Sequence, residues 1–211
     1  ICRCLVGSEM CIRDRMTVSC GNSLNHAMAS AVNMLGDVHG GAGEQCLEMM
    51  QKVKELLDQG GRLEEAVSEE IANHRQTKGK YIPGFGHRFH KPEDPRAARL
   101  MKLVSDAEGE KLVSGNFMRI GLEIQRQLSL GKSTGIAMNI DGATAVIFGE
   151  LGFAPPLARG LFCLSRSVGI LAHAWEQKNQ GGRNKGPTPP EFLWNYSCLL
   201  YTSPSPRDTD K

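Results

Sequence analysis

Residues 94–113, DPRAARLMKLVSDAEGEKLV, decide the fold class of this chain. Asp94 is a residue type that caps helix N-termini, and Pro95 fits the first helical position, where a missing N–H costs nothing. The pair is a strong start signal. The stretch therefore predicts a helix that begins at Pro95, and it sets how the neighbouring segments are interpreted.

On both sides of this stretch the interior consists of helical segments separated by glycine and proline. Residues 43–61 place Cys46, Leu47, Met50, Val53, Leu56 and Leu57 on one helical stripe, and Gly60-Gly61 end it. Further helices are predicted over residues 23–35, 62–80, 116–130, 141–152 and 155–180, the last apolar enough for a central helix. No period-two strand and no internal repeat is found. The sequence predicts an all-α fold.

The composition excludes several classes of partner. The chain has 25 Lys+Arg against 23 Asp+Glu, a net charge of +2, which is too even for a nucleic-acid surface. Aromatic residues make up only 6%, so base-stacking platforms are not indicated. No apolar run approaches the roughly 18 residues that a membrane helix requires. We expect no nucleic-acid partner and no membrane partner.

The two ends of the chain differ from the interior. Residues 1–15 and 198–211 carry no regular pattern, and MCIRDR and LLYTSPSPRD within them resemble translated library-adapter sequence. We therefore interpret both ends as artefactual and expect an N-terminally truncated fragment. Four of the seven cysteines lie in these ends, and Cys20, Cys46 and Cys163 form neither a CxxC pair nor a disulfide framework. A reducing, cytoplasmic location is the expectation.

Two histidine motifs are candidates for chemistry. His39 in GDVHGGAGE comes just before a predicted helix, whose dipole favours a neutral ring able to donate a hydrogen bond to a developing oxyanion. The alternative is a capping or core histidine. His87 and His90 form an H-x-x-H pair, but zinc needs a third ligand, and no residue has suggestive spacing. Because Gly86 comes directly before His87, we expect the glycine-rich turn to position the His87 ring.

Three further charged residues stand out. Arg96 lies in the first turn of its helix, an unfavourable place for a cation, which indicates a bound anion or an ordinary surface arginine. Asp141 lies in a small, apolar neighbourhood, where burial would raise its pKa toward that of a general base; the alternative is a helix N-cap. Arg166 interrupts an apolar helix and needs a partner. That partner is a substrate carboxylate, or the carboxylate of Asp141, Glu150 or Glu176.

The order of four motifs resembles that of the citrate synthase superfamily. HGGAGE, PGFGHRFHKPEDPRA, NIDGATAVIFGELGF and SRSVGILAHAWEQ follow one another with similar spacing over about residues 21–190. The superfamily includes citrate synthases, 2-methylcitrate synthases and citryl-CoA lyases. The resemblance implies an all-helical fold with a large and a small domain, assembled as a homodimer. It implies a coenzyme A thioester as substrate, with no bound cofactor and no metal.

The resemblance also implies a role for individual residues. His39 would donate to the thioester oxygen of acetyl-CoA, Asp141 would remove the methyl proton, and His87 would polarise the ketone of oxaloacetate. Arg96 and Arg166 would bind carboxylates of this 2-oxo dicarboxylate. The residues implied to lie against CoA are those of the turn, namely Ile82, Pro83, Gly84, Phe85 and Gly86.

One departure from the family pattern concerns an arginine that many citrate synthases carry before a proline, which reaches into the neighbouring subunit. Here Gly186 stands before Pro187, and Arg183 and Lys185 are the candidate replacements for substrate binding. This departure favours a citryl-CoA lyase-like or divergent member. The implied domains are 16–60 and 151–197 for parts of the large domain and 61–150 for the small domain.

The leading hypothesis is an acyltransferase or lyase that makes or breaks the C–C bond between the acetyl-CoA methyl and oxaloacetate. A 2-methylcitrate synthase, or an enzyme for another 2-oxo acid, is the alternative within the superfamily. Two hypotheses come from other classes. One is a metal-dependent hydrolase that uses His87 and His90, and the other is a non-catalytic helical fragment.

Overall fold

The computed structural model describes residues 9–87, 90 and 93–184, with side chains from residue 12 onward. These residues form eight helices: α1 (Glu9–Ser19), α2 (Leu24–Val32), α3 (Ala42–Asp58), α4 (Leu63–Thr77), α5 (Pro95–Gly109), α6 (Asn116–Ser129), α7 (Ile140–Glu150) and α8 (Pro155–Gln180). Apart from two isolated bridges, the described part of the chain contains no β-structure. The predicted all-α class is confirmed. None of the described helices has the length and apolar character that a membrane span needs.

The start of α5 follows the sequence prediction. Asp94 is the N-cap, its Oδ1 accepts a hydrogen bond from the Arg96 backbone N–H at 3.1 Å, and Pro95 is the first helical residue. The start of the chain differs from the prediction. Residues 9–15 were expected to carry no regular structure, but they belong to α1, which packs on α2 and α8. The helix has no amphipathic pattern of its own, so tertiary contact explains what periodicity did not indicate. Residues 198–211 lie outside the described residues.

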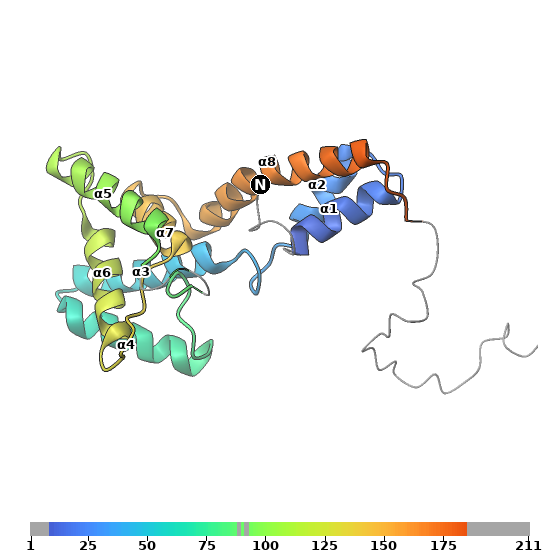
Figure 1. Cartoon of the computed structure of the whole chain (residues 1–211). Coiled ribbons are helices and arrows are strands. Elements are labelled where there is room, and N and C mark those ends of the chain that lie inside the picture. The colour runs from blue at the N-terminus through green and yellow to red at the C-terminus, as the bar shows by residue number, and fades with distance from the viewer. Residues whose placement is uncertain (1–8, 88–89, 91–92, 185–211) are drawn as a thin grey trace, which may run out of the picture.

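The helices α3 to α7 enclose one large hydrophobic core, and we call residues 42–150 the core unit (Figure 1). Its largest fully buried side chains are Leu47, Met49, Met50, Val53, Val67, Ile120, Ile124 and Val146. Helix α3 contributes to this core together with α6 and α7, although its residues were expected to belong to the large domain. The division at residue 61 stays a prediction.

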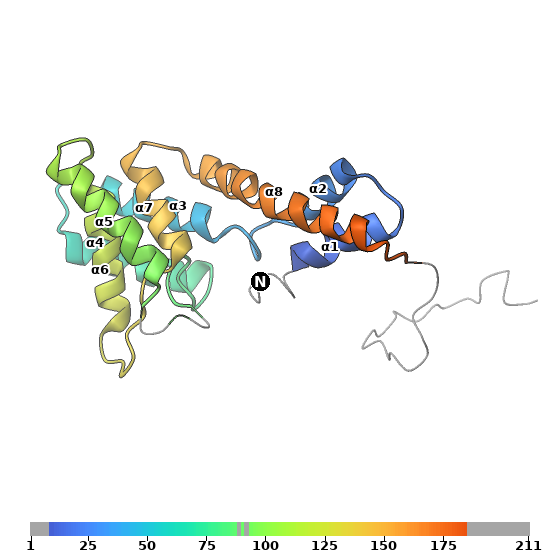
Figure 2. The same ribbon diagram turned by 45° about the horizontal axis from the view of Figure 1, so that its top comes forward.

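The other helices, α1, α2 and α8, form what we call the arm, and α8 extends from the core unit to the far end of the molecule (Figure 2). Two small apolar clusters hold the arm together, one around Ala31 and Ile170 and one around Val18, Ala27 and Ala174. Helix α8 was expected to be central. Instead it exposes Leu164, Val168, Leu171 and Trp175 along one face, because α1 and α2 cover only its other side.

Helix α7, which carries Asp141, is anchored at both ends. At its start, the Asn139 side chain caps the first turn. At its end, the Glu150 carboxylate accepts hydrogen bonds from the backbone N–H groups of Gly115, Phe117 and Met118 at 2.9, 2.7 and 3.2 Å. A carboxylate at a helix N-terminus satisfies orphan donors and complements the helix dipole. Glu150 therefore binds α6 and is not the partner that the sequence analysis considered for Arg166.

Candidate active site

The glycine-rich turn before His87 is joined to the segment that leads into α7. The Gly86 N–H donates to the Ala137 carbonyl oxygen at 2.7 Å, and the Asn139 N–H donates to that of Gly84 at 3.0 Å. The Asn139 side-chain amide donates to the Gly86 carbonyl oxygen at 2.8 Å. These bonds place the turn expected to contact CoA directly beside the helix of the expected base.

Gly84 lies where no other residue fits. Its φ is +82°, and a Cβ added there would lie 2.6 Å from Cys46 Sγ and 2.8 Å from Gly142 Cα. Positive φ and this close approach both require glycine. Cys46 is fully buried beneath the contact, and burial raises the pKa of its thiol. Gly84 is therefore a packing residue of the site.

Asp141 is the second residue of α7 and is not its cap. The cap is Asn139, whose Oδ1 accepts from the backbone N–H groups of Asp141 and Gly142 at 2.9 and 3.2 Å. The capping alternative for Asp141 is therefore wrong. Burial raises the pKa of the Asp141 carboxyl above its ordinary value, while the positive charge of Arg96 acts in the opposite direction. A carboxylate in such a setting suits proton abstraction.

A cavity of about 420 Å³ brings together three of the predicted site residues. Asp141, Arg96 and Arg166 all line it, from α7, α5 and α8. Arg96 also donates from Nε and Nη2 to the Asp94 carboxylate at 3.0 and 2.8 Å, which fixes its orientation. This cavity combines the partly desolvated carboxylate of Asp141 with two guanidinium groups, an arrangement that suits an anionic substrate; a second carboxylate, that of Glu44, also lines it.

His87 lies in the neighbouring, larger cavity of about 830 Å³. The backbone N–H of His90 donates to His87 Nδ1 at 3.0 Å, so a neutral His87 ring carries its proton on Nε2. Burial lowers the pKa of His87, and the charges of His90 and Arg96 lower it further. The ring is thus favoured in the neutral state, as a hydrogen-bond donor through Nε2.

The larger cavity includes part of the turn predicted to bind CoA. Ile82, Phe85 and Gly86 line it, whereas Pro83 and Gly84 do not. Three cationic side chains that the sequence analysis missed also line it, namely Arg75, Lys80 and Lys132. Cations around an apolar cavity suit a ligand with phosphate groups. For Lys80 the sequence contained a signal, because the basic stretch KGK (residues 78–80) comes just before the turn.

The metal interpretation of the H-x-x-H pair gains a third group in the structure. His87, His90 and Asp94 hold potential ligand atoms within 4.8 Å of one another. However, both Asp94 oxygens accept hydrogen bonds from Arg96, and His87 Nδ1 accepts one from the His90 N–H. A guanidinium bound to the same carboxylate repels a divalent cation. In this cluster the Asp94 carboxylate forms an ion pair with Arg96 and holds its guanidinium in place.

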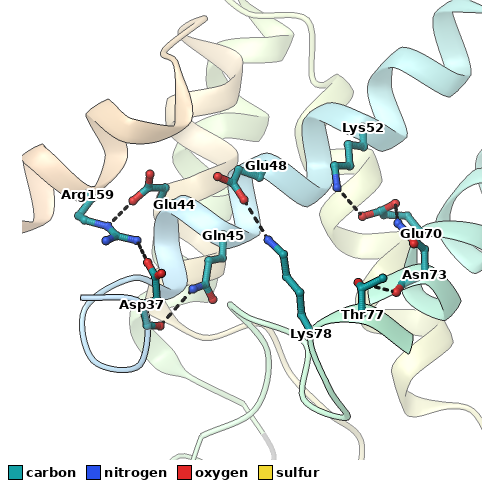
Figure 3. A network of polar contacts seen from close by, with 10 residues as sticks. All are labelled: Asp37, Glu44, Gln45, Glu48, Lys52, Glu70, Asn73, Thr77, Lys78 and Arg159. Carbon is teal, nitrogen blue, oxygen red and sulfur yellow. Dashed lines mark hydrogen bonds and ion pairs between the residues drawn. The ribbon is translucent and has the colours of Figure 1, made fainter. Parts of the chain in front are cut away.

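His39 lies in the loop between α2 and α3, two residues before the Gly41 N-cap of α3. Its carbonyl oxygen accepts from the Gly36 N–H at 2.9 Å, and its side chain is exposed and does not line the cavity of Asp141. Neighbouring Gly40 does line that cavity. Figure 3 shows that this loop is tied to α8 by Arg159, which bonds Asp37 and Glu44.

The two candidate replacements for the missing arginine are placed differently from the other site residues. Arg183 lines a separate cavity beside the turn between α1 and α2, together with Ser19, Asn22 and Gln177. The structure therefore does not bring it together with Arg96 and Arg166. Lys185 lies outside the described residues. Glu176, another candidate partner for Arg166, accepts a hydrogen bond from Arg15 at 2.6 Å.

Comparison with known proteins identifies the family of this chain. Residues 13–187 match the family model described as citrate synthase, C-terminal domain. A curated citrate synthase of Acidithiobacillus ferridurans is 32% identical over 167 residues, which cover 77% of this chain and 40% of that protein. A citrate synthase of Heyndrickxia coagulans is also 32% identical, over 168 residues. The chain spans about 40% of the length of these curated relatives.

Two solved structures share the fold. A citryl-CoA lyase from Hydrogenobacter thermophilus matches with a TM-score of 0.76 and 29% identity, covering 98% of this chain and 75% of that one. A citrate synthase from Thermotoga maritima matches with a TM-score of 0.68 and 25% identity, covering 97% of this chain and 52% of that one. The family model covers most of the chain, and the motifs that carry the resemblance lie around one pair of cavities. The chain belongs to the citrate synthase family.

Proposed function

We propose that this chain carries the acyl-CoA chemistry of a citrate synthase-type enzyme, which makes or breaks the C–C bond between the methyl group of acetyl-CoA and oxaloacetate. The observation that carries the proposal is the cavity in which Asp141 faces the same space as Arg96 and Arg166. The Asp141 carboxylate for the proton and the two guanidinium groups for substrate carboxylates match the demands of this reaction.

In the condensation direction, Asp141 removes a proton from the thioester methyl group. His39 donates a hydrogen bond to the thioester oxygen, which becomes the enolate oxygen. The enolate carbon attacks the ketone carbon of oxaloacetate, and His87 donates from Nε2 to the ketone oxygen as negative charge develops there. Arg96 and Arg166 hold the carboxylates. In the lyase direction the same groups act in reverse order, and Asp141 returns the proton.

The larger cavity is proposed to hold the nucleotide part of the CoA thioester. Ile82, Phe85 and Gly86 supply apolar and backbone surface, and the cationic residues at its rim suit the phosphates. Because the turn is hydrogen-bonded to the start of α7, a CoA molecule bound there delivers its thioester toward Asp141. No metal ion takes part in the proposed reaction.

Arg183 and Lys185 remain candidate substrate-binding residues. Since Arg183 lies away from the cavity of its own chain, its proposed contribution is to a second copy. A homodimer is therefore part of the proposal, supported by the exposed apolar face of α8, which includes Leu164, Val168 and Trp175. Sedimentation of the chain over a range of concentrations tests it: a dimer is expected, and a Val168→Asp variant is expected to weaken it.

The proposal also keeps a reducing, cytoplasmic location. Cys20, Cys46 and Cys163 are free thiols, which agrees with such a compartment. A 2-methylcitrate synthase, or a related enzyme for another 2-oxo acid, remains the alternative within the family. These alternatives differ in the acyl group or the 2-oxo acid, and both use the base and the anion-binding arginines in the same way.

The decisive experiment offers citryl-CoA to the full chain and identifies the products. Citrate with free CoA indicates a synthase, and acetyl-CoA with oxaloacetate indicates a lyase. The control is Asp141→Asn, which keeps the shape of the side chain and removes its basicity, with an expected loss of about 10²–10⁴-fold in kcat. A folded Asp141→Asn variant that turns citryl-CoA over as well as the unmodified chain would contradict the assigned base. Activity lost to chelators would favour the metal-dependent hydrolase, and no turnover at all would favour the non-catalytic fragment.

A further inference from the structure

Arg159 contacts a carboxylate on each side of His39 in the sequence. Its Nη2 donates to Asp37 Oδ1 at 2.5 Å, two residues before His39, and its Nε forms an ion pair with Glu44, five residues after it (Figure 3). Arg159 itself comes from α8, more than a hundred residues further along the chain. A planar guanidinium with several donors suits two carboxylates at once, which a lysine does not.

The loop fits closely beneath this guanidinium. A Cβ added at Gly41 would lie 3.0 Å from Arg159 Nη2 and 3.0 Å from the Gly36 carbonyl oxygen. The Gln45 side chain donates to the Asp37 carbonyl oxygen at 3.1 Å, so the loop is also held from α3. Residues 36–41 contribute few apolar contacts, since Asp37, Val38 and His39 are all exposed. Polar contacts, with Arg159 at their centre, therefore determine the path of the loop.

Arg159 also balances a charge at the anion-binding cavity. Glu44 lines the same cavity as Asp141, Arg96 and Arg166, and its side chain is only 14% exposed. A carboxylate there repels an anionic substrate. The adjacent guanidinium of Arg159 offsets that negative charge.

From these contacts we propose that Arg159 is a positioning residue of the active site. It fixes the His39 loop against α8 and neutralises Glu44 at the edge of the cavity. The inference rests on the proposed function, but it assigns to Arg159 two separate effects. The first acts on the geometry of His39 and therefore on the transition state. The second acts on the charge of the cavity and therefore on substrate binding.

The kinetic test compares Arg159→Gln with a matched control, Arg126→Gln. Arg126 also bonds two carboxylates, those of Glu123 and Glu64, but it lies on α6 and lines neither cavity. With citryl-CoA as substrate, Arg159→Gln is expected to lower kcat about tenfold or more and to raise KM about fivefold, since a misplaced hydrogen-bond donor costs roughly that much or more. Arg126→Gln is expected to change both by less than twofold.

A double variant separates the two effects. Adding Glu44→Gln to Arg159→Gln removes the charge that Arg159 balanced, so KM is expected to return to within twofold of the unmodified chain while kcat stays low. Unchanged kcat and KM in Arg159→Gln would overturn the proposal. So would a double variant in which kcat recovers together with KM, because the loop would then need no guanidinium.

A second measurement keeps the inference independent of turnover. Amide hydrogen exchange of the Gly36 N–H, which donates to the His39 carbonyl oxygen, reports whether the loop opens. In the full chain, Arg159→Gln is expected to speed this exchange about tenfold or more, and Arg126→Gln to leave it unchanged. If citryl-CoA is not turned over by the unmodified chain, the proposed function fails while this exchange still decides the positioning role. Equal exchange in all three proteins would show that Arg159 does not hold the loop.

Discussion

The core unit and the arm hold their parts of the site by different means. In the core unit, the turn of residues 82–86 and the start of α7 are joined by backbone hydrogen bonds over a continuous buried core. The arm is held by two small apolar clusters, and the His39 loop that links it to the core unit is held by charged side chains. Asp141 and the turn are thus fixed by packing, whereas the position of His39 relative to them depends on ion pairs, which solvent and salt weaken.

The largest expected effect is that of a methyl group at Gly84, inside the core unit. Because a Cβ there meets both Cys46 and Gly142 and φ is positive, Gly84→Ala is expected to cost about 3 kcal/mol or more of unfolding free energy. Urea unfolding followed by circular dichroism measures the change. Hydrogen exchange is expected to rise in α3 and α7 more than in α1 and α2.

Gly86→Ala is the matched control for this variant. Gly86 also has positive φ, at +81°, but an added Cβ there would meet only Ile136 Cγ2 at 3.8 Å. Backbone strain alone is expected to cost about 1 kcal/mol. Equal costs at Gly84 and Gly86 would show that the turn is not packed against α7 as described.

The next effect concerns Asn139, which joins the turn to α7. Asn139→Asp keeps an oxygen to cap the N–H groups of Asp141 and Gly142 but cannot donate to the Gly86 carbonyl oxygen. Asn139→Ala loses both contacts and is expected to cost about 1–2 kcal/mol of stability. Asn139→Asp is expected to keep most of the stability but to raise KM for citryl-CoA, because the turn loses its side-chain hydrogen bond and is held by the two backbone bonds alone.

Gln125→Leu serves as the control for Asn139. Gln125 accepts a hydrogen bond from the Met138 N–H at 2.7 Å, so its loss weakens the same segment without touching the turn. Its expected effect is on unfolding free energy alone. If Gln125→Leu and Asn139→Asp raise KM equally, the contact with Gly86 has no special role.

A smaller effect is expected on the pH dependence of catalysis. Asp141 must be ionised to act as a base, and burial raises its pKa above 3.8 while the charge of Arg96 lowers it. Removing that charge in Arg96→Gln raises the pKa further, so the fall of kcat/KM on acidification is expected to begin at higher pH. The quantity to compare is the pH at which kcat/KM falls on acidification, because the loss of Arg96 also changes the maximal value of kcat/KM.

Arg99→Gln provides the comparison for the pH profile. Arg99 lies on the same helix as Arg96 and does not line the cavity of Asp141. Its acid limb is expected to coincide with that of the unmodified chain. A limb that moves to lower pH in Arg96→Gln would reverse the assigned sign and would point to a different base.

The smallest effect is expected in the arm. Leu164 is 67% exposed on α8, so Leu164→Ala, measured at a dilution at which the chain is monomeric, should change the unfolding free energy by less than about 0.5 kcal/mol. Leu47→Ala in the core unit should cost about 2–5 kcal/mol, because Leu47 is fully buried. Similar costs at the two positions would mean that the two regions are packed alike.

Local signals in the sequence predicted part of this picture. Asp94 and Pro95 mark the start of α5 because a cap and a first-turn proline act within a few residues. The placement of His39 just before α3 followed from the same kind of signal. Arg96, Asp141 and Arg166 stand out from their local sequence, the resemblance to the family implies their roles, and the structure brings these three to one cavity.

Other features depend on contacts between distant segments, which one sequence does not contain. Arg159 meets Asp37 across 122 residues, and nothing near either residue indicates the pair. The exposure of Val168 on α8 depends on which helices cover it, so an apolar sequence alone predicted a central helix wrongly. The cap of α7 was misplaced by two residues because Asn139 and Asp141 are both good capping residues.

The hydrogen bonds of Glu150 have a mechanical consequence for any motion of the protein. They fix one end of α7 to the N-terminus of α6, while Asn139 fixes the other end to the turn. Helix α7 therefore cannot slide or rotate by itself. A movement that carries Asp141 toward Arg166 is therefore expected to carry α6 and the turn with it.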